Sequence, residues 1–457
     1  MHWSSDSMFI AITNADRSTV QILCPAQPDW GCTVSEGAAG LQQALWVPAQ
    51  HTLMTIPDFS LHTSVWHVHS GSSQALPGAK HLCGSIVFGQ GSAGAGQWAA
   101  LLSREHGKDT VHWYDTVKTV SPGSDLAQDA LWSSPHEQSA TVAVGTQDAA
   151  KLLMAPHGHS VWVIDDPLHA YAEEWAMDGT CLHKLSLRVA GLGIAQASAH
   201  ISAAGGLLVL PTHSGPVHVI NALSHDTLLV ANEPRTSSVL SCTETDVFVE
   251  VASGCEDTAC CDILSSPDTK KRTSALQLEV WRQRTLSANQ GSDSRFVCAS
   301  VDLQPRQLLP SVINESSPPS LGATTHCSTS ADEGLLALVC ASRPSTVCVY
   351  ETAGGSAATP VAALCLRGDV SGMAWDPESS RLLVATASSN VLVWEPGRAY
   401  AIQSRMGRAQ AAVVRSIVPP PAPAAPWLLA SRGRWCTARM TSGLNATELE
   451  DSGGASA

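Results

Sequence analysis

The sequence predicts an all-β protein of the β-propeller class, with seven or eight blades. Three observations support this fold class: one stretch that contains three short strands, an aromatic residue that recurs at the interval of a blade, and further copies of the same pattern along most of the chain. With 457 residues, 44% of them hydrophobic, the chain can bury a large core. We expect one domain over residues 1–446 and a disordered tail over 447–457.

The clearest copy of the unit is Ser371 to Glu395. Its first strand ends at Trp375, and the stretch that follows is rich in Asp, Pro and Ser, which form turns. Arg381 to Thr386 is a nearly continuous apolar run, which predicts a middle strand buried on both faces. Val391 to Glu395 is β-branched and aromatic, and its final Trp-Glu stands where WD repeats carry Trp-Asp. The stretch therefore predicts one blade without its outer strand.

The aromatic residue at the first turn recurs along the chain, at Trp3, Trp46, Phe88 and Trp132. These positions are 43, 42 and 44 residues apart, within the ~40–45 residues of a WD-type blade. Ile201 takes the same position 69 residues further on. Regular copies resume over 326–350, and a degraded last copy covers 413–436. Between them, residues 224–322 form a polar insertion, in which we expect strands at Asp246–Val251, Leu276–Trp281 and Phe296–Leu303.

Composition excludes several classes of partner and location. Asp and Glu number 40 against 26 Lys and Arg, and the net charge of −14 opposes the phosphate neutralisation that nucleic-acid binding requires. The 14 cysteines lack regular spacing, and some, such as Cys340 and Cys348, lie inside apolar strands, as expected in a reducing cytosol. No window approaches ~18 uninterrupted apolar residues, and no signal peptide is evident, so we expect no membrane insertion and no secretion.

The sequence predicts no catalytic, cofactor-binding or metal-binding residues. Cys242, Cys255, Cys260 and Cys261 do not have the spacing of a structural zinc site. The pairs His67-x-His69 and His157-x-His159 could ligate a metal, but exposed histidines at strand ends are the simpler interpretation. We therefore expect the protein not to be an enzyme.

Three further motifs have a simpler interpretation than chemistry. Gly89 to Gly94 fits a dinucleotide fingerprint only superficially, because no helix follows it. The carboxylate pairs Asp165-Asp166 and Glu173-Glu174 are expected to be solvated. Lys270 to Arg272, which follows Ser265-Ser266-Pro267-Asp268, is either a phosphorylation-regulated docking stretch or a solvated charge run.

The N-terminal third resembles one family closely. His2 to Ile10, Gln27 to Cys32 and Ser35 to Leu41 are similar to the WRAP-type centrosomal WD-repeat proteins. Further similar segments are Asp58–His62 through Val65–Trp66, Ser294–Leu303 and Val370–Trp394, so the resemblance covers nearly the whole chain. The blade pattern does not dictate Gln27 to Leu41, so this segment distinguishes the family from WD repeats in general.

The resemblance implies a non-enzymatic scaffold at centrosomes, centriolar satellites, basal bodies or spindle poles. There it would support microtubule minus-end anchoring, spindle assembly and cilium assembly, together with a coiled-coil microtubule-anchoring partner and a kinesin-14 motor. The sequence departs from the family in two places. Family members have a repeat before the one that begins here at Met1, and residues 255–284 are extra. The first blade is therefore expected to be absent, or the ring to be closed by a mixed blade.

Three other functions each require a motif of their own. A ubiquitin-ligase substrate receptor needs Trp-Asp-x-Arg at a blade end, whereas here Trp394 is followed by Glu395-Pro396-Gly397-Arg398, which displaces the arginine by one position. A propeller enzyme needs polar or metal groups that converge at the central channel, and no motif provides them. The paired-arginine motif of a phosphoinositide-binding propeller is also absent from the sequence.

Overall fold

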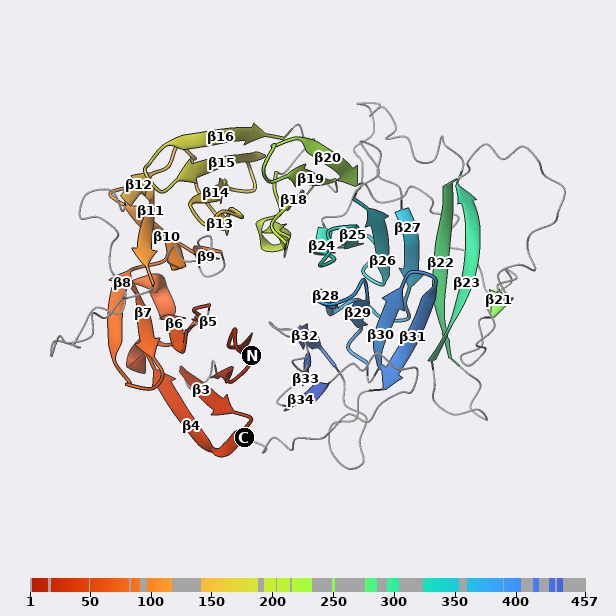
Figure 1. Cartoon of the computed structure of the whole chain (residues 1–457), viewed down its shortest axis with the longest axis horizontal. Helices are drawn as coiled ribbons and strands as arrows, with labels where there is room; N and C mark the ends of the chain where they lie inside the picture. Colours follow the sequence, from red (N-terminus) through yellow and green to blue (C-terminus); the bar gives the residue numbers. More distant parts are fainter. Residues whose placement is uncertain are drawn as a thin grey trace. The chain divides into compact units, whose positions relative to one another are not determined.

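The computed structural model of the chain describes residues 2–14, 18–48, 50–81, 84–90, 97–116, 141–187, 193–202, 204–213, 216–231, 249–250, 276–285, 294–303, 324–352, 360–388, 390–403, 414–418, 427–431 and 434–438. These residues form β-strands and no α-helix (Figure 1). Their only helical segments are three single 3₁₀ turns: η2 (Gly37–Ala39), η3 (Asp58–Ser60) and η4 (Gln196–Ser198). No helix in this part of the chain has the length and apolar character needed to cross a membrane.

The strands up to β20 form five antiparallel sheets of four strands. The first two sheets comprise β1 (His2–Trp3), β2 (Ile10–Asn14), β3 (Thr19–Cys24) and β4 (Gln27–Ser35), then β5 (Gln43–Trp46), β6 (Thr52–Ile56), β7 (His62–His67) and β8 (Ser73–Pro77). The next two comprise β9 (Ile86–Gln90), β10 (Gln97–Glu105), β11 (Lys108–Asp115) and β12 (Thr141–Ala143), then β13 (Lys151–Met154), β14 (Ser160–Ile164), β15 (Tyr171–Ala176) and β16 (Cys181–Ser186). The fifth comprises β17 (His200–Ile201), β18 (Leu207–Pro211), β19 (Val217–Asn221) and β20 (Thr227–Ala231).

The remaining strands form three sheets. One contains the four-stranded meander β24 (Thr324–Thr329), β25 (Leu335–Cys340), β26 (Thr346–Glu351) and β27 (Pro360–Cys365), extended beyond β27 by β22 (Leu276–Thr285), β23 (Ser294–Leu303) and β21 (Val249–Glu250). The next is β28 (Gly372–Trp375), β29 (Leu382–Ala385), β30 (Asn390–Glu395) and β31 (Arg398–Gln403). The last has three strands, β32 (Ser416–Val418), β33 (Trp427–Ser431) and β34 (Arg434–Ala438). Seven four-stranded meanders of this kind confirm the predicted WD-repeat propeller fold class.

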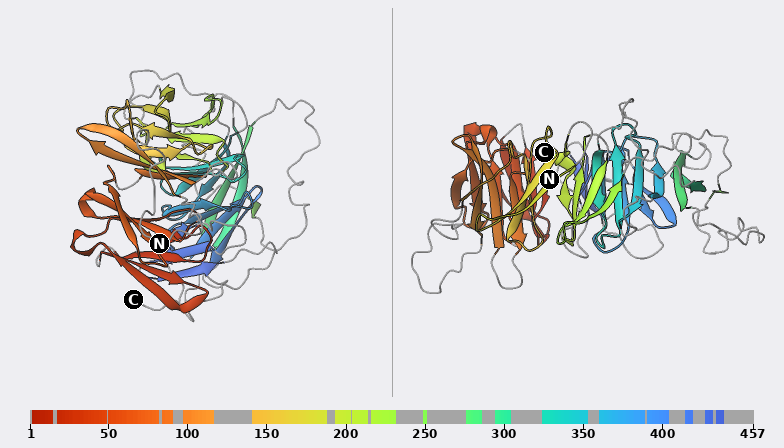
Figure 2. Two further views of the ribbon diagram at one scale, coloured as in Figure 1. Left: turned by 60° about the vertical axis from the view of Figure 1, so that its left-hand side comes forward. Right: turned by 90° about the horizontal axis from the view of Figure 1, so that it is seen from above.

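The described residues group into two compact units. The first comprises those in 1–214 and 221–226, and the second those in 215–220, 227–419 and 427–457. In the first unit, successive sheets lie face to face (Figures 1 and 2). Apolar side chains that alternate along the strands pack between them. Phe9, Val20 and Leu53 fill the space between the first two sheets. Whether the chain forms one domain, as the sequence predicts, stays a prediction.

The clearest copy of the repeat forms the sheet that was predicted. All four residues of β29 are buried, so the expected middle strand is confirmed. The Trp375 indole Nε1 donates to Ser328 O at 3.0 Å and its ring meets Trp394 edge-on, at 6.2 Å between centroids. Burial of both rings against Val349 and Leu364 joins this sheet to the preceding one within the second unit.

The polar insertion adds strands to a sheet. The predicted strands at Leu276–Trp281 and Phe296–Leu303 lie in β22 and β23, a long antiparallel hairpin. β22 then pairs in parallel with β27, with Glu279 opposite Ala362 and Arg282 opposite Cys365. The insertion therefore extends the outer edge of the β24–β27 meander, which a purely loop-like insertion would leave unpaired.

One predicted repeat boundary is wrong. Trp132, which lies outside the described residues, was assigned to the start of the fourth unit. However, β12 follows it in sequence and pairs with β11 of the third sheet, with Val142 opposite Val111. The fourth sheet begins with β13, where Met154 pairs with Val161 as Trp3 pairs with Ile10. Trp162 therefore belongs to the second strand of its sheet. The boundary is wrong because Trp132, in the long stretch of sequence between β11 and β12, matches the period by chance.

Candidate interaction surface

The most exposed large apolar side chains that the structure describes belong to the turn between β6 and β7. Phe59 is 85% exposed and Leu61 is 80% exposed. Phe59 has φ 67° and ψ 1°, and Ser60 has φ 48°, so two consecutive non-glycine residues lie in the left-handed region. Such a conformation costs of order 1–3 kcal/mol per residue and persists only where neighbouring structure imposes it. We call Asp58–Leu61 the Phe59 turn.

Two glycines hold the Phe59 turn from either side. A Cβ on Gly78 would lie 1.9 Å from Ser60 O, so the chain after β8 passes directly over the turn backbone. A Cβ on Gly40 would lie 2.0 Å from Asp58 Oδ2, and Gly40 also has φ +77°. The backbone contact requires glycine at Gly78, whereas at Gly40 the left-handed φ is the main requirement, because the Asp58 side chain can move away from a Cβ.

A buried carboxylate fastens the β4–β5 connection to the strands beside the turn. The Glu36 side chain is only 5% exposed. It accepts hydrogen bonds from Thr55 Oγ1 of β6, Ser64 Oγ of β7 at 3.3 Å and Trp66 Nε1 of β7 at 3.3 Å. Trp66 Nε1 also donates to Thr55 Oγ1 at 2.8 Å. We call Glu36, Thr55, Ser64 and Trp66 the Glu36 cluster; it supplies the rigid base on which the strained turn stands.

The segments that carry the family resemblance therefore meet in space. Gln27 to Leu41 ends in the connection that holds Glu36 and Gly40, and Asp58 to His62 forms the Phe59 turn. Both lie at one end of the β5–β8 sheet, because Gln43 at the start of β5 pairs with Ile56 at the end of β6. Sequence reasoning did not identify Phe59 or Leu61 as functional. The available signal was two large apolar residues inside a turn next to Pro57 and Asp58.

A second feature occupies the corresponding end of the β13–β16 sheet. Here a cavity of about 580 Å³ is lined by Gly145, Asp165, Leu168, His169, Tyr171, Glu173, Lys184 and neighbouring residues. Glu173, whose side chain is 1% exposed, accepts from Tyr171 OH at 2.8 Å, Trp175 Nε1 at 2.8 Å and Gly145 N at 3.1 Å, and pairs with Lys184 Nζ at 3.1 Å. We call Tyr171, Glu173, Trp175 and Lys184 the Glu173 cluster.

The electrostatics of the Glu173 cluster follow from these contacts. Burial by itself raises the pKa of Glu173, but the hydrogen bonds from Tyr171, Trp175 and Lys184 outweigh it and hold the pKa below its ordinary value. Burial, followed by the hydrogen bond to the Glu173 carboxylate, raises the pKa of Tyr171. The cluster is therefore an ionised carboxylate with satisfied partners, which is a structural arrangement.

The expectation that the carboxylate pairs are solvated is wrong for three of the four residues. Asp165, Glu173 and Glu174 are buried. Asp165 Oδ1 accepts from Asp148 N at 2.8 Å and Asp166 N at 3.0 Å, which caps the connection before β13. The sequence did not reveal this burial because it depends on backbone amides and on side chains from other strands and connections as well as from β15 itself.

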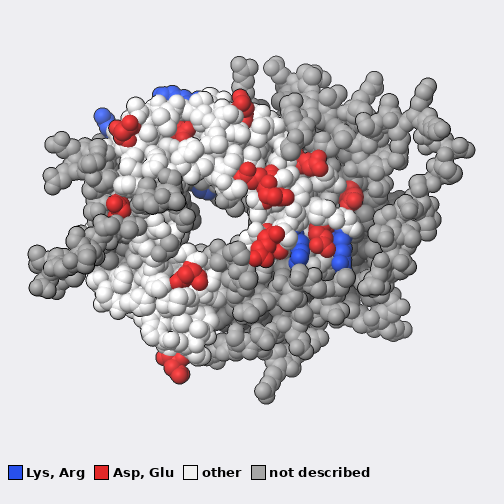
Figure 3. Space-filling view, in the orientation of Figure 1, with Lys and Arg blue, Asp and Glu red and all other residues white. Residues whose placement is uncertain are grey.

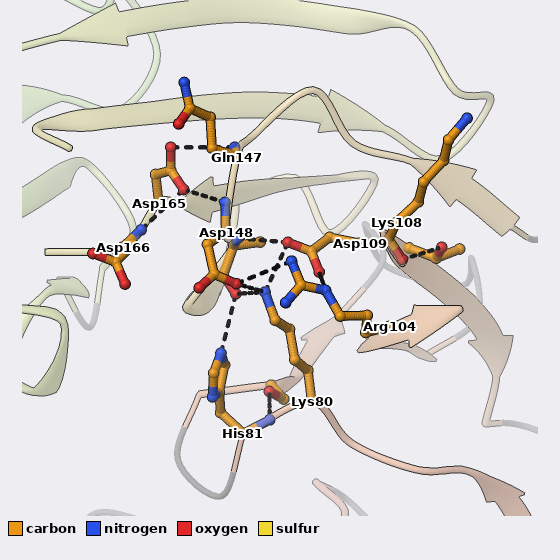
Figure 4. A network of polar contacts seen from close by, with 12 residues as sticks. Lys80, His81, Arg104, Lys108, Asp109, Gln147, Asp148, Asp165 and Asp166 are labelled. Atoms are coloured by element: carbon orange, nitrogen blue, oxygen red, sulfur yellow. Dashed lines mark hydrogen bonds and ion pairs between the residues drawn. The ribbon is translucent and has the colours of Figure 1, made fainter. Parts of the chain in front are cut away.

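A polar network joins the third and fourth sheets of the first unit (Figure 4). Lys80 Nζ donates to Asp109 Oδ2 at 2.7 Å, to Asp148 Oδ1 at 2.5 Å and to Ala149 O at 2.7 Å. Arg104 Nε contacts Asp109 Oδ1 at 3.0 Å and its Nη2 contacts Asp148 Oδ1 at 3.2 Å. The hydrogen bond from Lys80 is the first cause of a lowered pKa at Asp148. Because Lys80 and Asp109 are nearly fully buried, this network fixes the packing of the two sheets.

One constellation contains the residue types of a hydrolase without its geometry. Ser160 Oγ donates to Glu174 Oε1 at 2.6 Å, and His225 Nε2 lies 3.0 Å from Glu174 Oε2. The carboxylate stands between the hydroxyl and the imidazole, so the imidazole does not contact the serine as it does in a Ser-His-Asp triad. His225 stacks on His183 with 4.1 Å between ring centroids. Glu174 thus connects β14, through Ser160, to the β19–β20 turn, through His225.

Three of the four histidines in the predicted pairs lie in turns, and His67 is the last residue of β7. His157 and His159 are both exposed in the β13–β14 turn. His69 Nε2 contacts His51 Nδ1 at 2.7 Å, and His51 Nε2 contacts Asp6 Oδ2 at 2.7 Å, whereas His67 Nδ1 accepts from Ser70 N at 3.2 Å. No group of three His, Cys, Asp or Glu in the described part of the chain has the arrangement of a metal site.

Several predicted features lie outside the described residues. They are Cys242, Cys255, Cys260 and Cys261, Lys270 to Arg272 with the preceding serines, residues 91–96 of the glycine-rich stretch, and the tail over 447–457. Arg398, the displaced arginine of the ligase motif, is described. It lies 3.8 Å from Glu395 Oε1 through Nη1 and stacks over Tyr400 at 5.1 Å, so it is engaged within its own hairpin.

Comparison with known proteins agrees with the sequence resemblance. The chain is similar to the WD repeat-containing protein WRAP73 of Mus musculus, with 23% identity over 405 residues, which cover 88% of this chain and 77% of that protein. Among solved structures, the computationally designed Ika8 protein matches with a TM-score of 0.50 and 9% identity, over 95% of this chain and 93% of Ika8. The structural match indicates the fold alone. No family model matches the chain.

Proposed function

We propose, on the premise that this chain is a WRAP-type WD-repeat protein, that it is a non-enzymatic scaffold at the centrosome, basal body or spindle pole. In this role it supports microtubule minus-end anchoring, spindle assembly and ciliogenesis. Its partners are a coiled-coil microtubule-anchoring protein and a kinesin-14 motor. The WD-repeat character of the relative supports a scaffold or adaptor in general, and the resemblance of the irregular segments supports the more specific role.

One observation carries the proposal. The segments most specific to the family, Gln27 to Leu41 and Asp58 to His62, are brought together around the Glu36 cluster. There they present exposed apolar side chains on a strained turn with a rigid base. Loops positioned by a rigid scaffold are where binding residues concentrate, and strain that persists marks a position with a function beyond folding.

The test is localisation in dividing and ciliating cells. Full-length tagged protein is expected to concentrate at microtubule-organising centres and at the base of cilia, and its depletion is expected to release microtubule minus ends from spindle poles. A tagged protein that complements depletion yet stays diffuse through mitosis and ciliation contradicts the proposal. An unrelated WD-repeat propeller expressed from the same vector controls for recruitment by fold alone.

A further inference from the structure

We infer that the Phe59 turn docks a partner segment in which apolar side chains are flanked by lysine or arginine. This inference rests on the proposed scaffold function and adds to it the chemistry of the partner. It starts from Phe59 and Leu61, which stand two positions apart on one turn and remain largely in water. Burying a large apolar side chain against a partner is favourable, so a surface that exposes two of them on a fixed turn is prepared to bind.

The turn cannot hide these side chains by relaxing. Gly78 packs against its backbone, Gly40 packs against the Asp58 side chain, and the Glu36 cluster fixes the strands on either side. Ser60 N also donates to Pro57 O at 3.2 Å, which closes the turn. Because the turn is already held in its exposed conformation, it loses little conformational entropy when a partner binds. This favours affinity.

Charge determines the second property of the partner. Residues 1–79 contain five acidic residues against a single arginine and no lysine. Three of the five are at least partly exposed, namely Asp6, Asp29 and Asp58, whereas Glu36 is buried. Asp58 stands directly before Phe59 and is partly exposed. On the face shown in Figure 3, Asp and Glu likewise predominate over Lys and Arg among the described residues. A segment with basic side chains beside its apolar ones is therefore complementary, whereas an acidic segment is repelled.

The experiment is a selection of phage-displayed random peptides on the purified full-length protein. Two variants remove the apolar contact: F59S/L61S, and F59G, which also removes the left-handed strain. The matched control is L182S/L223S, which deletes two other leucines that are more than half exposed. Selected peptides are then synthesised and their affinities for all four proteins are measured.

Peptides that support the inference combine apolar residues with an excess of Lys and Arg. They are expected to lose about tenfold or more in affinity for F59S/L61S and for F59G, and to keep their affinity for L182S/L223S. D58N is expected to weaken binding about twofold at low salt, while D29N, at an exposed position on β4, leaves it unchanged. Because F59G relieves strain, its thermal midpoint should be equal to or above that of the wild type, which separates lost binding from lost folding.

Two results overturn the inference: peptides that bind F59S/L61S as tightly as the wild type, or discriminating peptides that are neutral or acidic. The outcome is separable from that of the proposed function. If the protein does not localise to microtubule-organising centres but basic peptides bind the wild type more tightly than the turn variants, the cellular role is wrong and the docking surface stands. If the protein localises as proposed but no peptide distinguishes the wild type from the turn variants, the docking surface is wrong and the scaffold function stands.

Discussion

The Glu36 cluster and the Glu173 cluster are both built on a buried glutamate, but the two glutamates lie in different positions relative to their sheets. Each places a buried glutamate at one end of a sheet, where it accepts a hydrogen bond from an indole, Trp66 in one and Trp175 in the other. Glu36 comes from the connection before its sheet, 30 residues away from its tryptophan, whereas Glu173 lies two residues before its own on the same strand. Glu36 joins a connection to two strands, whereas Glu173 is held mostly by β15 and β16, with one further hydrogen bond from Gly145 N.

This difference in origin explains what each cluster presents. Glu36 ties a connection to two strands, which leaves the Phe59 turn without freedom and exposes its side chains. Glu173 is satisfied mostly by side chains of β15 and β16, and the space above it stays open as a cavity. The Glu36 cluster therefore supports a rigid protrusion, and the Glu173 cluster lies beside an open cavity.

The largest effect is expected from removing the carboxylates. E36A should lower the free energy of unfolding by ~3 kcal/mol, because hydroxyl and indole donors of two strands lose a buried acceptor. E173A should lower the free energy of unfolding by about half as much. The Lys184 side chain is 60% exposed, so water can solvate its ammonium group once the carboxylate is removed. Urea denaturation of both variants checks this order. Equal losses would show that the origin of the glutamate does not matter.

The second effect concerns the glycines that hold each turn. G78A should cost about 2 kcal/mol, because the new Cβ meets the Ser60 carbonyl oxygen and neither backbone can yield freely. G193A, whose Cβ would meet His169 C at 2.6 Å beside the cavity, should cost less, since the cavity allows that turn to move. Thermal unfolding of the two variants measures the difference. A greater loss in G193A contradicts the rigid-turn account.

The third effect is a pH dependence that belongs to the Glu173 cluster. The pKa of Glu173 is lowered from its ordinary 4.5, so the folded state favours the ionised form. The resulting stability is present above pH ~4.5 and is lost as the pH falls through the lower folded-state pKa. E173Q should therefore be less stable than the wild type at neutral pH and show a shallower loss on acidification. If the two proteins lost stability equally as the pH falls, Glu173 would not be the source of this pH dependence.

The smallest effect is expected at the exposed residues. F59G should raise stability by up to about 1 kcal/mol, since glycine adopts a positive φ without strain and an exposed ring contributes little packing. L168S, at the rim of the cavity, should change stability by less than about 0.5 kcal/mol. Calorimetry on both proteins tests this. A destabilised F59G would mean that the ring packs in the folded protein after all.

Much of the fold could be predicted from local pattern. Strands such as β25, β26 and β29 are apolar runs between turn residues, and the spacing from Trp3 to Phe88 matches a blade. The boundary at Trp132 is wrong because the long sequence between β11 and β12 displaces the start of the next sheet, while Trp132 lies by chance at the expected interval. Only the pairing of β12 with β11 reveals the true boundary, since pairing is a contact between residues far apart in the chain.

The candidate site could be predicted only in part. The segments Gln27 to Leu41 and Asp58 to His62 stand out because the sequence pattern of the repeat does not dictate them, although Gln27–Ser35 forms β4, the outer strand of the first sheet. Their mutual contact, the burial of Glu36 and the exposure of Phe59 do not follow from either segment alone. The same holds for Asp165 and Glu173, which were expected in water and are buried.

The sequence by itself determined the all-β class, the repeat and the resemblance to WRAP-type proteins, because periodicity and turn chemistry are local properties. The tertiary structure decided which residues face water. Exposure of Phe59 and burial of Glu36 depend on Gly78, Gly40, Thr55 and Trp66, which reach them from other segments. Side-chain burial and hydrogen-bond partners are properties of contacts across the chain, and these exist only once the sheets have packed.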